Sequence, residues 1–365
     1  MNEKNELEIV FKDEEGVSGV IWQRVAAFLS TKAPSTRETY IYIVKEWCEF
    51  LGINFGSSEG ARGFLSASSL DALRFIRWLE RRPGLKVRGW RSKEEAKEVE
   101  ESRLYPSQLK RTKVYVRDGL HPTQSNNTIG KKVTALRRIY RELVKAGLLS
   151  VNPFDSVPTP KRQSGMKRPT EMVSYGVIKE ILDSVDISNS KGRRDKGILA
   201  LLFGAGLRRS EIIKLRLEDF RVSEAGTPYL YLRATKAGKD AYQAIPEWAA
   251  KVLTTVIEDR LKQGASSEGF IFNSYRGRKG LTPTEHPISS SGIYKLFIRY
   301  CRLAGVEGRV SPHSARATAI TRLLDQGFSH RDVLLFSRHS SVQMVELYDK
   351  RRSTVDENPA KELKY

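Results

Sequence analysis

The feature that most constrains this chain is a stretch near its middle that has neither helical nor strand-like periodicity. Residues 156–170 read SVPTPKRQSGMKRPT, with three prolines, four basic residues and no acidic residue. Proline fixes the backbone and removes a hydrogen-bond donor, so a segment of this kind is typical of an extended linker. The chain has 365 residues, enough for two domains of ordinary size. The linker therefore predicts one domain on each side of it.

The part before the linker has helical periodicity. Apolar residues recur at helical spacing in residues 35–51, 69–82 and 126–147, and Ser35 followed by Glu38 indicates a capping box. We predict a helical domain whose apolar periodicity is interrupted by one inserted segment. Its predicted parts are an acidic N-terminal segment over residues 1–19, the domain itself over 20–155, and an inserted, charged segment over about 81–120.

The part after the linker is also mostly helical, with one region of period-two alternation. Residues 227–246 read TPYLYLRATKAGKDAYQAIP, which predicts two strands joined by a turn at Ala237-Gly238-Lys239. We predict a domain over residues 171–350 and a C-terminal tail over 351–365. The expected fold class is mainly α with a small antiparallel β-sheet, in two domains.

Charge indicates the class of partner. The chain carries 63 Lys and Arg against 43 Asp and Glu, a net charge of +20 that favours a polyanion, above all a nucleic acid. Scaffolding on RNA and binding to a membrane surface remain open on charge alone. Because no run of about 18 apolar residues and no secretion signal is visible, we expect a cytoplasmic protein that does not span a membrane.

Cofactor motifs are missing from the sequence. The two cysteines, Cys48 and Cys301, lie far apart and have no ligands at metal-binding spacing, and no glycine-rich phosphate loop or paired-carboxylate motif is present. We therefore expect chemistry without a cofactor, in particular without ATP or a metal ion.

Five short motifs in the second domain carry residues suited to phosphate chemistry. They are GLRRSE, TKAGK, PHSAR, RHSS and a tyrosine nine residues after the last histidine, and they contain Arg208, Lys236, His313, Arg316, His339 and Tyr348. Each motif taken alone is an ordinary surface pattern. In this order and at these intervals they resemble the signature of the tyrosine recombinases, also called phage integrases. The resemblance covers about residues 20–350.

The resemblance implies a fold and an activity. The expected architecture is a helical core-binding domain and a catalytic domain that together clamp a DNA duplex. The expected enzyme is a site-specific recombinase, in which Tyr348 attacks a DNA phosphate and forms a 3′-phosphotyrosine without ATP or metal. Conserving the bond energy in this way lets a second 5′-hydroxyl reverse the attack. The sequence does not say whether the outcome is integration, excision or resolution.

The resemblance also implies roles for the other motif residues. Arginine offers parallel donors to non-bridging phosphate oxygens, which suits Arg208 and Arg316, and His339 would add a further donor. His313 would carry the tyrosine proton, and Lys236 would protonate the 5′-oxygen leaving group. Glu211 matches an acidic position that orients the arginine or histidine, although a simple salt bridge is the alternative.

The spacing between His339 and Tyr348 predicts a local structure. Nine residues on one continuous helix would put the two side chains on opposite faces, so we expect a helix to begin between them. Ser340 with Gln343 indicates a capping box, with His339 just before the helix and Tyr348 two turns inside it.

Three positions depart from a clean match. Arg338 stands where the family commonly has glycine, which restricts the backbone and adds charge near the site. Arg208 and Arg209 form a doublet, so the functional arginine could be either, although the flanking residues favour Arg208. Tyr365 is a competing nucleophile without motif context.

Basic and aromatic residues outside the site are candidates for DNA contacts, and ordinary surface charge is equally plausible for each. We expect helix 126–147 to present its cations off the apolar stripe, and Ser289 to Ser291 to cap a helix that reaches a groove. The candidates are Lys131, Lys132, Arg138, Arg141, Lys161, Arg162, Arg276, Arg278, Lys279, Tyr294, Lys295 and Arg299.

The expected partner is double-stranded DNA at specific sites. By the resemblance, protomers would form a homodimer on one site and a homotetramer in synapsis, with the tail after Tyr348 docking on a neighbouring subunit, and accessory DNA-bending proteins are compatible with this scheme. Two other functions remain open. One is a type IB topoisomerase that relaxes DNA as a monomer, and the other is a non-cleaving architectural DNA-binding protein of the same fold.

Overall fold

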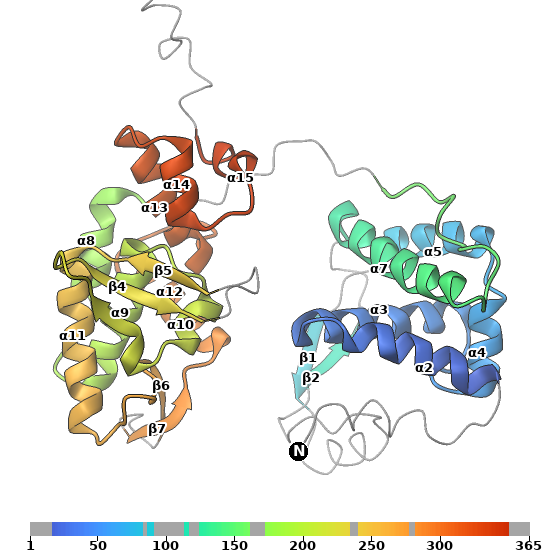
Figure 1. Cartoon of the computed structure of the whole chain (residues 1–365), viewed down its shortest axis with the longest axis horizontal. Coiled ribbons are helices and arrows are strands. Elements are labelled where there is room, and N and C mark those ends of the chain that lie inside the picture. The colour runs from blue at the N-terminus through green and yellow to red at the C-terminus, as the bar shows by residue number, and fades with distance from the viewer. Residues whose placement is uncertain are drawn as a thin grey trace, which may run out of the picture. The chain divides into compact units, whose positions relative to one another are not determined.

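The computed structural model describes most of the chain and divides it into two compact units, Met1–Met166 and Lys167–Tyr365. The described residues are 17–82, 86–90, 113–116, 124–160, 172–233, 240–276 and 282–349. In Figure 1 the first unit runs from blue to green and the second from yellow-green to red. Both are mostly helical with small antiparallel sheets, which confirms the predicted fold class. Most of the acidic N-terminal segment, the inserted segment, the linker and the tail lie outside the described residues.

Helices form the body of the first unit. They are α2 (Val17–Ser30), α3 (Pro34–Leu51), α4 (Ser58–Leu65), α5 (Ser69–Arg81) and α7 (Asn126–Lys145). The predicted capping box of Ser35 and Glu38 is wrong, because α3 begins at Pro34 after Ala33, which makes no side-chain cap. Within the predicted inserted segment, β1 (Lys86–Trp90) pairs antiparallel with β2 (Lys113–Val116).

An aromatic cluster holds the core of the first unit together. The Trp47 indole donates to the Tyr140 hydroxyl at 2.9 Å, and that hydroxyl donates to the Phe64 carbonyl oxygen at 2.7 Å. The rings of Phe64 and Tyr140 are stacked with centroids 4.6 Å apart. All three side chains are fully buried, so the hydrogen bonds satisfy polar atoms that would otherwise be costly to bury.

The second unit surrounds one buried helix. Its elements are α8 (Tyr175–Asp183), α9 (Ser190–Gly204), α10 (Arg209–Lys214), η1 (Leu217–Asp219), β3 (Phe220–Val222), β4 (Pro228–Leu232), β5 (Ala241–Ala244), α11 (Glu247–Lys262), β6 (Asn273–Arg276), β7 (Thr282–Pro287), α12 (Ser290–Leu303), α13 (Pro312–Asp325), α14 (His330–Ser337) and α15 (Val342–Glu346). Residues 198–202 of α9 are fully buried, as in a helix that is apolar all round. Helices α8, α11, α12 and α13 pack against it.

The sheet β3-β4-β5 is antiparallel, with β4 in the middle, and it contains both predicted strands. The predicted turn at residues 237–239 lies outside the described residues. No helix in the described ranges is long and apolar enough to span a bilayer.

Candidate active site

Arg208 is placed by the turn that follows the buried helix α9. The chain turns at Gly206, which has a φ of 58°, and Arg208 is the N-cap residue of α10. Glu211 in the first turn of α10 accepts the Arg208 backbone N–H at 2.8 Å and a side-chain N–H from Nη1, also at 2.8 Å. The neighbouring Arg209 is exposed and donates to the Ser290 carbonyl oxygen at 3.3 Å. Of the doublet, Arg208 is therefore the residue directed at Glu211.

Gly206 also fixes the second arginine. Its carbonyl oxygen accepts a hydrogen bond from Arg316 Nη1 at 2.5 Å, and Arg316 Nη2 donates to the Ser337 carbonyl oxygen. A Cβ atom on Gly206 would lie 3.1 Å from two ring atoms of Phe336. Glycine thus satisfies the left-handed backbone and the close packing at once.

Helix α13 carries His313 and Arg316 on its first turn. Pro312 is at the N-terminal end of the helix, and the Ser311 backbone N–H donates to the Ser314 hydroxyl at 3.0 Å. His313 is exposed, whereas Arg316 is only 1% exposed. One helical turn therefore positions an accessible imidazole beside a buried cation.

The end of α14 brings His339 into the same cluster. Arg338 caps the helix in the left-handed conformation, with φ 51° and ψ 41°, and its carbonyl oxygen accepts from Arg208 Nη2 at 3.2 Å. His339 follows immediately, and its buried Nδ1 atom has no hydrogen-bond partner in the part of the chain that the structure describes.

Tyr348 lies against both histidines. Its hydroxyl oxygen is 3.4 Å from His313 Nε2, and its ring is nearly parallel to the His339 ring, with centroids 5.8 Å apart and planes 9° apart. A short helix, α15, does begin between His339 and Tyr348, as predicted. The predicted cap is wrong, because the N-cap is Ser341 and its side chain makes no capping hydrogen bond. Tyr348 also lies beyond the helix, which ends at Glu346, and not two turns inside it.

The cluster is strongly cationic, and its pKa values follow from burial and charge. Burial and the positive charges of Arg208 and Arg338 lower the pKa of Arg316 to about 10. Burial, followed by the charges of Arg316 and Arg208, lowers the pKa of His339 to about 4. Burial raises the pKa of Tyr348, and the two arginines only partly oppose it. The resting site therefore holds a neutral His339 and a protonated phenol.

Glu211 supplies negative charge inside this cluster. Burial alone would raise its pKa, but the charge of Arg338 and the hydrogen bonds from Arg208 outweigh burial and lower it. The carboxylate is therefore ionised at neutral pH. Arg338 Nη2 donates to it at 2.8 Å, an interaction that the sequence analysis missed. The only signal for it in the sequence was a long, charged residue where a helix end favours glycine.

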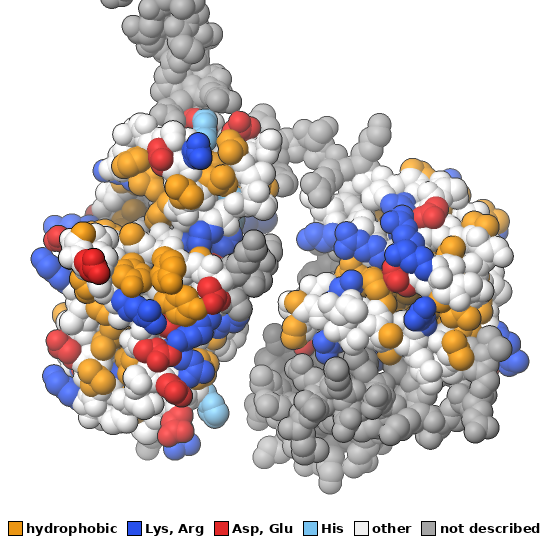
Figure 2. Space-filling model, viewed as in Figure 1, with side chains coloured by type: hydrophobic (Ala, Val, Ile, Leu, Met, Phe, Trp, Pro, Cys, Tyr) orange, Lys and Arg blue, Asp and Glu red, His pale blue; other side chains and the backbone are white. Residues whose placement is uncertain are grey.

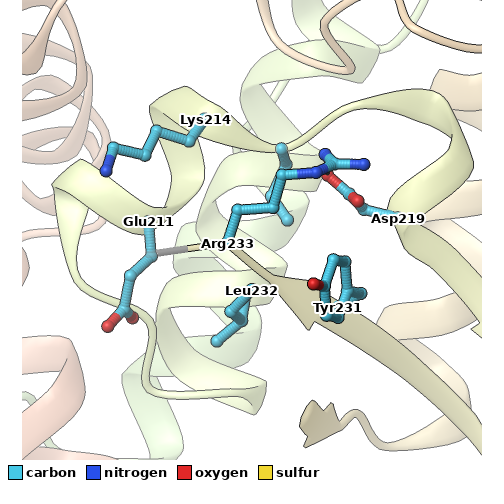
Figure 3. A pocket seen from close by; sticks show the side chains of 7 residues that line it. Glu211, Lys214, Asp219, Tyr231, Leu232 and Arg233 are labelled. Atoms are coloured by element: carbon cyan, nitrogen blue, oxygen red, sulfur yellow. Dashed lines mark hydrogen bonds and ion pairs between the residues drawn. The ribbon is translucent and has the colours of Figure 1, made fainter. Parts of the chain in front are cut away.

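Lys236 lies outside the described residues, but the strand that leads to it is anchored near Glu211. Arg233, just after β4, donates to Asp219 at 2.6 Å and pairs with Glu218. A small hollow is lined by seven residues: Glu211, Lys214, Leu215, Asp219, Tyr231, Leu232 and Arg233. Figure 3 shows the Arg233 side chain running to Asp219, with Glu211 on α10 on the other side of the hollow.

The candidate DNA contacts of the first unit fall into two groups. Lys131, Arg138 and Arg141 are exposed on α7, and Figure 2 shows basic side chains gathered on the surface where this helix runs. Lys132 is only 7% exposed, and its ammonium group donates to buried Glu46. The expectation that Lys132 lies off the apolar face is therefore wrong.

In the second unit, the described candidates are on the surface. Arg276 ends β6, and Tyr294, Lys295 and Arg299 are exposed on α12. The Ser289 hydroxyl accepts the Gly292 N–H at 3.0 Å, which confirms the predicted cap of this helix. The remaining candidates lie outside the described residues: Lys161, Arg162, Arg278 and Lys279, as does the competing nucleophile Tyr365. The described residues contain no group of three His, Cys, Asp or Glu side chains suited to hold a metal ion.

Comparison with known sequences identifies a family match in the second unit. Residues 173–354 match the model of the phage integrase family. Over 242 residues the chain is 29% identical to tyrosine recombinase XerC of Bacillus pumilus, covering 65% of this chain and 74% of the relative. It is 25% identical over 232 residues to tyrosine recombinase XerD of Listeria innocua, covering 62% and 72%.

Solved structures share the fold at lower identity. The XerH site-specific recombinase bound to its palindromic difH substrate superposes with a TM-score of 0.58 at 14% identity, covering 95% of this chain and 92% of that one. The Tn1549 transposon integrase in complex with circular intermediate DNA gives 0.56 at 17% identity, covering 94% and 99%.

Proposed function

This chain belongs to the phage integrase family of tyrosine recombinases, and from that membership we propose that it is a site-specific DNA recombinase that cleaves and rejoins strands through a 3′-phosphotyrosine. The observation that carries the proposal is the position of Tyr348. Its hydroxyl is within 3.4 Å of His313, and its ring lies on His339, in a cluster that also holds Arg208 and Arg316. A phenol, a base and buried cations are the groups that transfer to phosphorus requires.

The chemistry is balanced without a further reactant. The Tyr348 oxygen attacks the phosphorus of a DNA phosphodiester, and its proton passes to His313. The bond from phosphorus to the 5′-oxygen breaks, and the leaving oxygen takes a proton from Lys236. A phosphodiester is exchanged for another, so a 5′-hydroxyl from a second strand can reverse the sequence and release Tyr348.

Buried nitrogen atoms without partners support a phosphate in this cluster. Arg316 Nε is buried and has no hydrogen-bond partner among the described residues, and the same holds for His339 Nδ1. Leaving a buried donor unsatisfied is costly, and an anion that accepts from it recovers that cost. Neutral His339 still offers one N–H group, so its lowered pKa is compatible with the role of a donor.

The position of Lys236 in the sequence supports its proposed role. It follows Arg233 by three residues, and three residues of extended chain span roughly 10 Å. Arg233 and Glu211 line the same hollow, so the described part of the chain before Lys236 ends near the Arg208–Glu211 pair, which supports the proposed role of this lysine.

The proposed partner is duplex DNA, bound by both units, as a clamp. The XerH and Tn1549 neighbours were captured with DNA, and the exposed cations of α7 in this chain suit the same partner. We further propose that two protomers occupy one site and that two sites form a tetramer, in which the tail after Tyr348 docks on a neighbour, with DNA-bending proteins as helpers at sites that need them.

Covalent capture tests the function and finds the site. The full chain is incubated with duplexes that carry a randomised centre and a nick, then denatured, and the protein-bound DNA is sequenced. We expect one enriched sequence, linked through its 3′-phosphate to Tyr348. The Tyr348→Phe variant should give no adduct, whereas Tyr242→Phe, at a 68% exposed tyrosine on β5, should match the wild type. No adduct from the wild type, or equal adduct from Tyr348→Phe, would refute the proposal.

A further inference from the structure

Arg338 is held in a conformation that arginine rarely adopts. Among the described residues other than glycine, it alone has a positive φ, 51°. A left-handed backbone costs about 1–2 kcal/mol for a residue with a Cβ atom, and glycine would avoid that cost. Such strain persists where the surrounding structure compensates for it, and it clusters at functional sites. We therefore infer the role of Arg338 from the contacts that its side chain makes.

The side chain of Arg338 folds back into the active site. It is 11% exposed, and its Nη2 atom donates to Glu211 Oε2 at 2.8 Å while Nη1 donates to the Phe336 carbonyl oxygen at 3.3 Å. The Arg338 carbonyl oxygen accepts from Arg208 Nη2 at 3.2 Å. Both the backbone and the side chain of this one residue thus meet the Arg208–Glu211 pair.

Glu211 is shared between two guanidinium groups. Its Oε1 atom accepts from Arg208 and its Oε2 atom accepts from Arg338, and the carboxylate is only 4% exposed. If Arg208 were its sole cation, the carboxylate would cancel the charge that Arg208 brings to a phosphate. With Arg338 present, two positive charges face one negative charge, and a net positive charge remains for the substrate.

We propose that Arg338 is a positioning residue that holds the charge of Glu211 and, through its own carbonyl oxygen, the Nη2 group of Arg208, so that the Arg208 guanidinium keeps its positive charge for the scissile phosphate. This rests on the proposed function of the site. Direct contact of Arg338 with DNA is the alternative role, and the second test distinguishes the two, because only a positioning residue that acts through its bond to Glu211 depends on that carboxylate.

The first test distinguishes the effect of the Arg338 charge from the effects of its backbone strain and of altered folding. Single-turnover cleavage is measured on the duplex recovered by covalent capture, for Arg338→Met, Arg338→Gly and Arg338→Lys. Met keeps the length and loses the charge, Gly loses the charge and the strain, and Lys keeps the charge. Arg331→Met, at an exposed position on the same helix, is the matched control.

We expect Met and Gly to slow cleavage by a similar factor, on the order of 10- to 100-fold, because both remove the cation opposite Glu211. Lys should stay within about 5-fold of the wild type, since its ammonium group keeps the positive charge and can donate one hydrogen bond to Glu211, as Arg338 does. The dissociation constant for the duplex should stay nearly constant, because the effect belongs to the transition state. Cleavage by Met or Gly at the wild-type rate would overturn the proposal, as would a slow Lys variant with unchanged thermal stability.

The second test asks whether Arg338 acts through Glu211. In a Glu211→Gln background there is no negative charge to hold, so adding Arg338→Met should slow cleavage by less than about 3-fold. If the full loss persists in that background, Arg338 acts on the DNA directly, and its role as a positioning residue is refuted. The wild type serves as the internal reference, because failure of the wild type to form an adduct refutes the recombinase function and not the role of Arg338.

Discussion

The hydroxyl oxygen of Tyr348 lies 3.4 Å from Nε2 of His313, although the two residues are 35 positions apart, one in α13 and the other just beyond α15. The contact is at the long limit of a hydrogen bond, as is common for catalytic pairs before substrate binds. Burial raises the pKa of Tyr348, so the phenol does not ionise on its own at neutral pH. In the proposed reaction, Tyr348 therefore depends on the His313 imidazole to take its proton.

Replacing the His313 imidazole should make the rate of cleavage depend on the pKa of the Tyr348 phenol. His313→Gln keeps a polar side chain but cannot take a proton, and we expect adduct formation at neutral pH to fall on the order of 100-fold or more. As the pH rises toward the raised pKa of Tyr348, the phenolate fraction grows, so the variant should regain rate faster than the wild type. Single-turnover cleavage as a function of pH measures this. A variant that cleaves like the wild type at neutral pH would show that the proton leaves by another route.

His339 should make folding sensitive to acid. Its pKa is lowered from 6.5 to about 4 by burial and by the neighbouring arginines, so the unfolded chain binds a proton there at a higher pH than the folded chain does. The stability that the neutral ring contributes is present above pH 6.5 and is lost as the pH falls toward 4. Thermal unfolding midpoints should fall more steeply over this window for the wild type than for His339→Gln. His286→Gln, at an exposed strand position, should follow the wild-type curve.

Two glycines with the same kind of backbone should respond differently to alanine. Gly206 has a φ of 58°, and a Cβ there would meet Phe336, while Gly226 has a φ of 80° and open space around it. Gly226→Ala should cost only about 1 kcal/mol and leave cleavage intact. Gly206→Ala should cost more and should also slow cleavage, because the shifted carbonyl group no longer holds Arg316. Urea unfolding and adduct formation measure the two effects, and equal behaviour of both variants would contradict this account.

The elements of the fold were predictable because their signals are local. Apolar residues at helical spacing marked the helix that ends at Lys145, and alternation marked β4 and β5. The cap at Ser289 was also correct, since its partner Gly292 is three residues away. The capping box at Ser35 failed because the helix begins at Pro34, so its N-cap is Ala33, two residues before the predicted one.

What the sequence could not reveal depends on contacts between distant segments. Lys132 follows a basic neighbour and has the composition of a surface residue, but Glu46 on α3 draws it into the interior. The position of Tyr348 beyond α15 follows from packing of a five-residue helix that carries almost no periodic signal. Arg338 was visible only as an unexpected residue, because its partner Glu211 is 127 positions away.

The tail after the nucleophile should matter for assembly and not for chemistry. If it docks on a neighbouring protomer, deleting residues 353–365 should remove cooperative occupancy of a full site while leaving adduct formation on a half-site duplex unchanged. Mobility-shift titrations of full and half sites measure the first effect, and covalent capture measures the second. Unchanged cooperativity in the truncated chain would show that the protomers meet through another surface.

Substitution of two adjacent lysines on α7 should have different effects, Lys131→Met on DNA binding and Lys132→Met on folding. Lys131 is exposed, so Lys131→Met should change stability by less than about 0.5 kcal/mol. If it faces a phosphate, the slope of log affinity against log salt should fall by about one. Lys132 is a partner of buried Glu46, whose carboxylate also pairs with Arg82 at 3.5 Å, so Lys132→Met should cost about 3 kcal/mol, since it removes one of the cations that compensate a buried charge. Its salt slope should match the wild type at temperatures where the variant is folded. Urea unfolding and fluorescence anisotropy with a labelled duplex supply both readouts, and a reduced slope for Lys132→Met would place that ammonium group on the DNA after all.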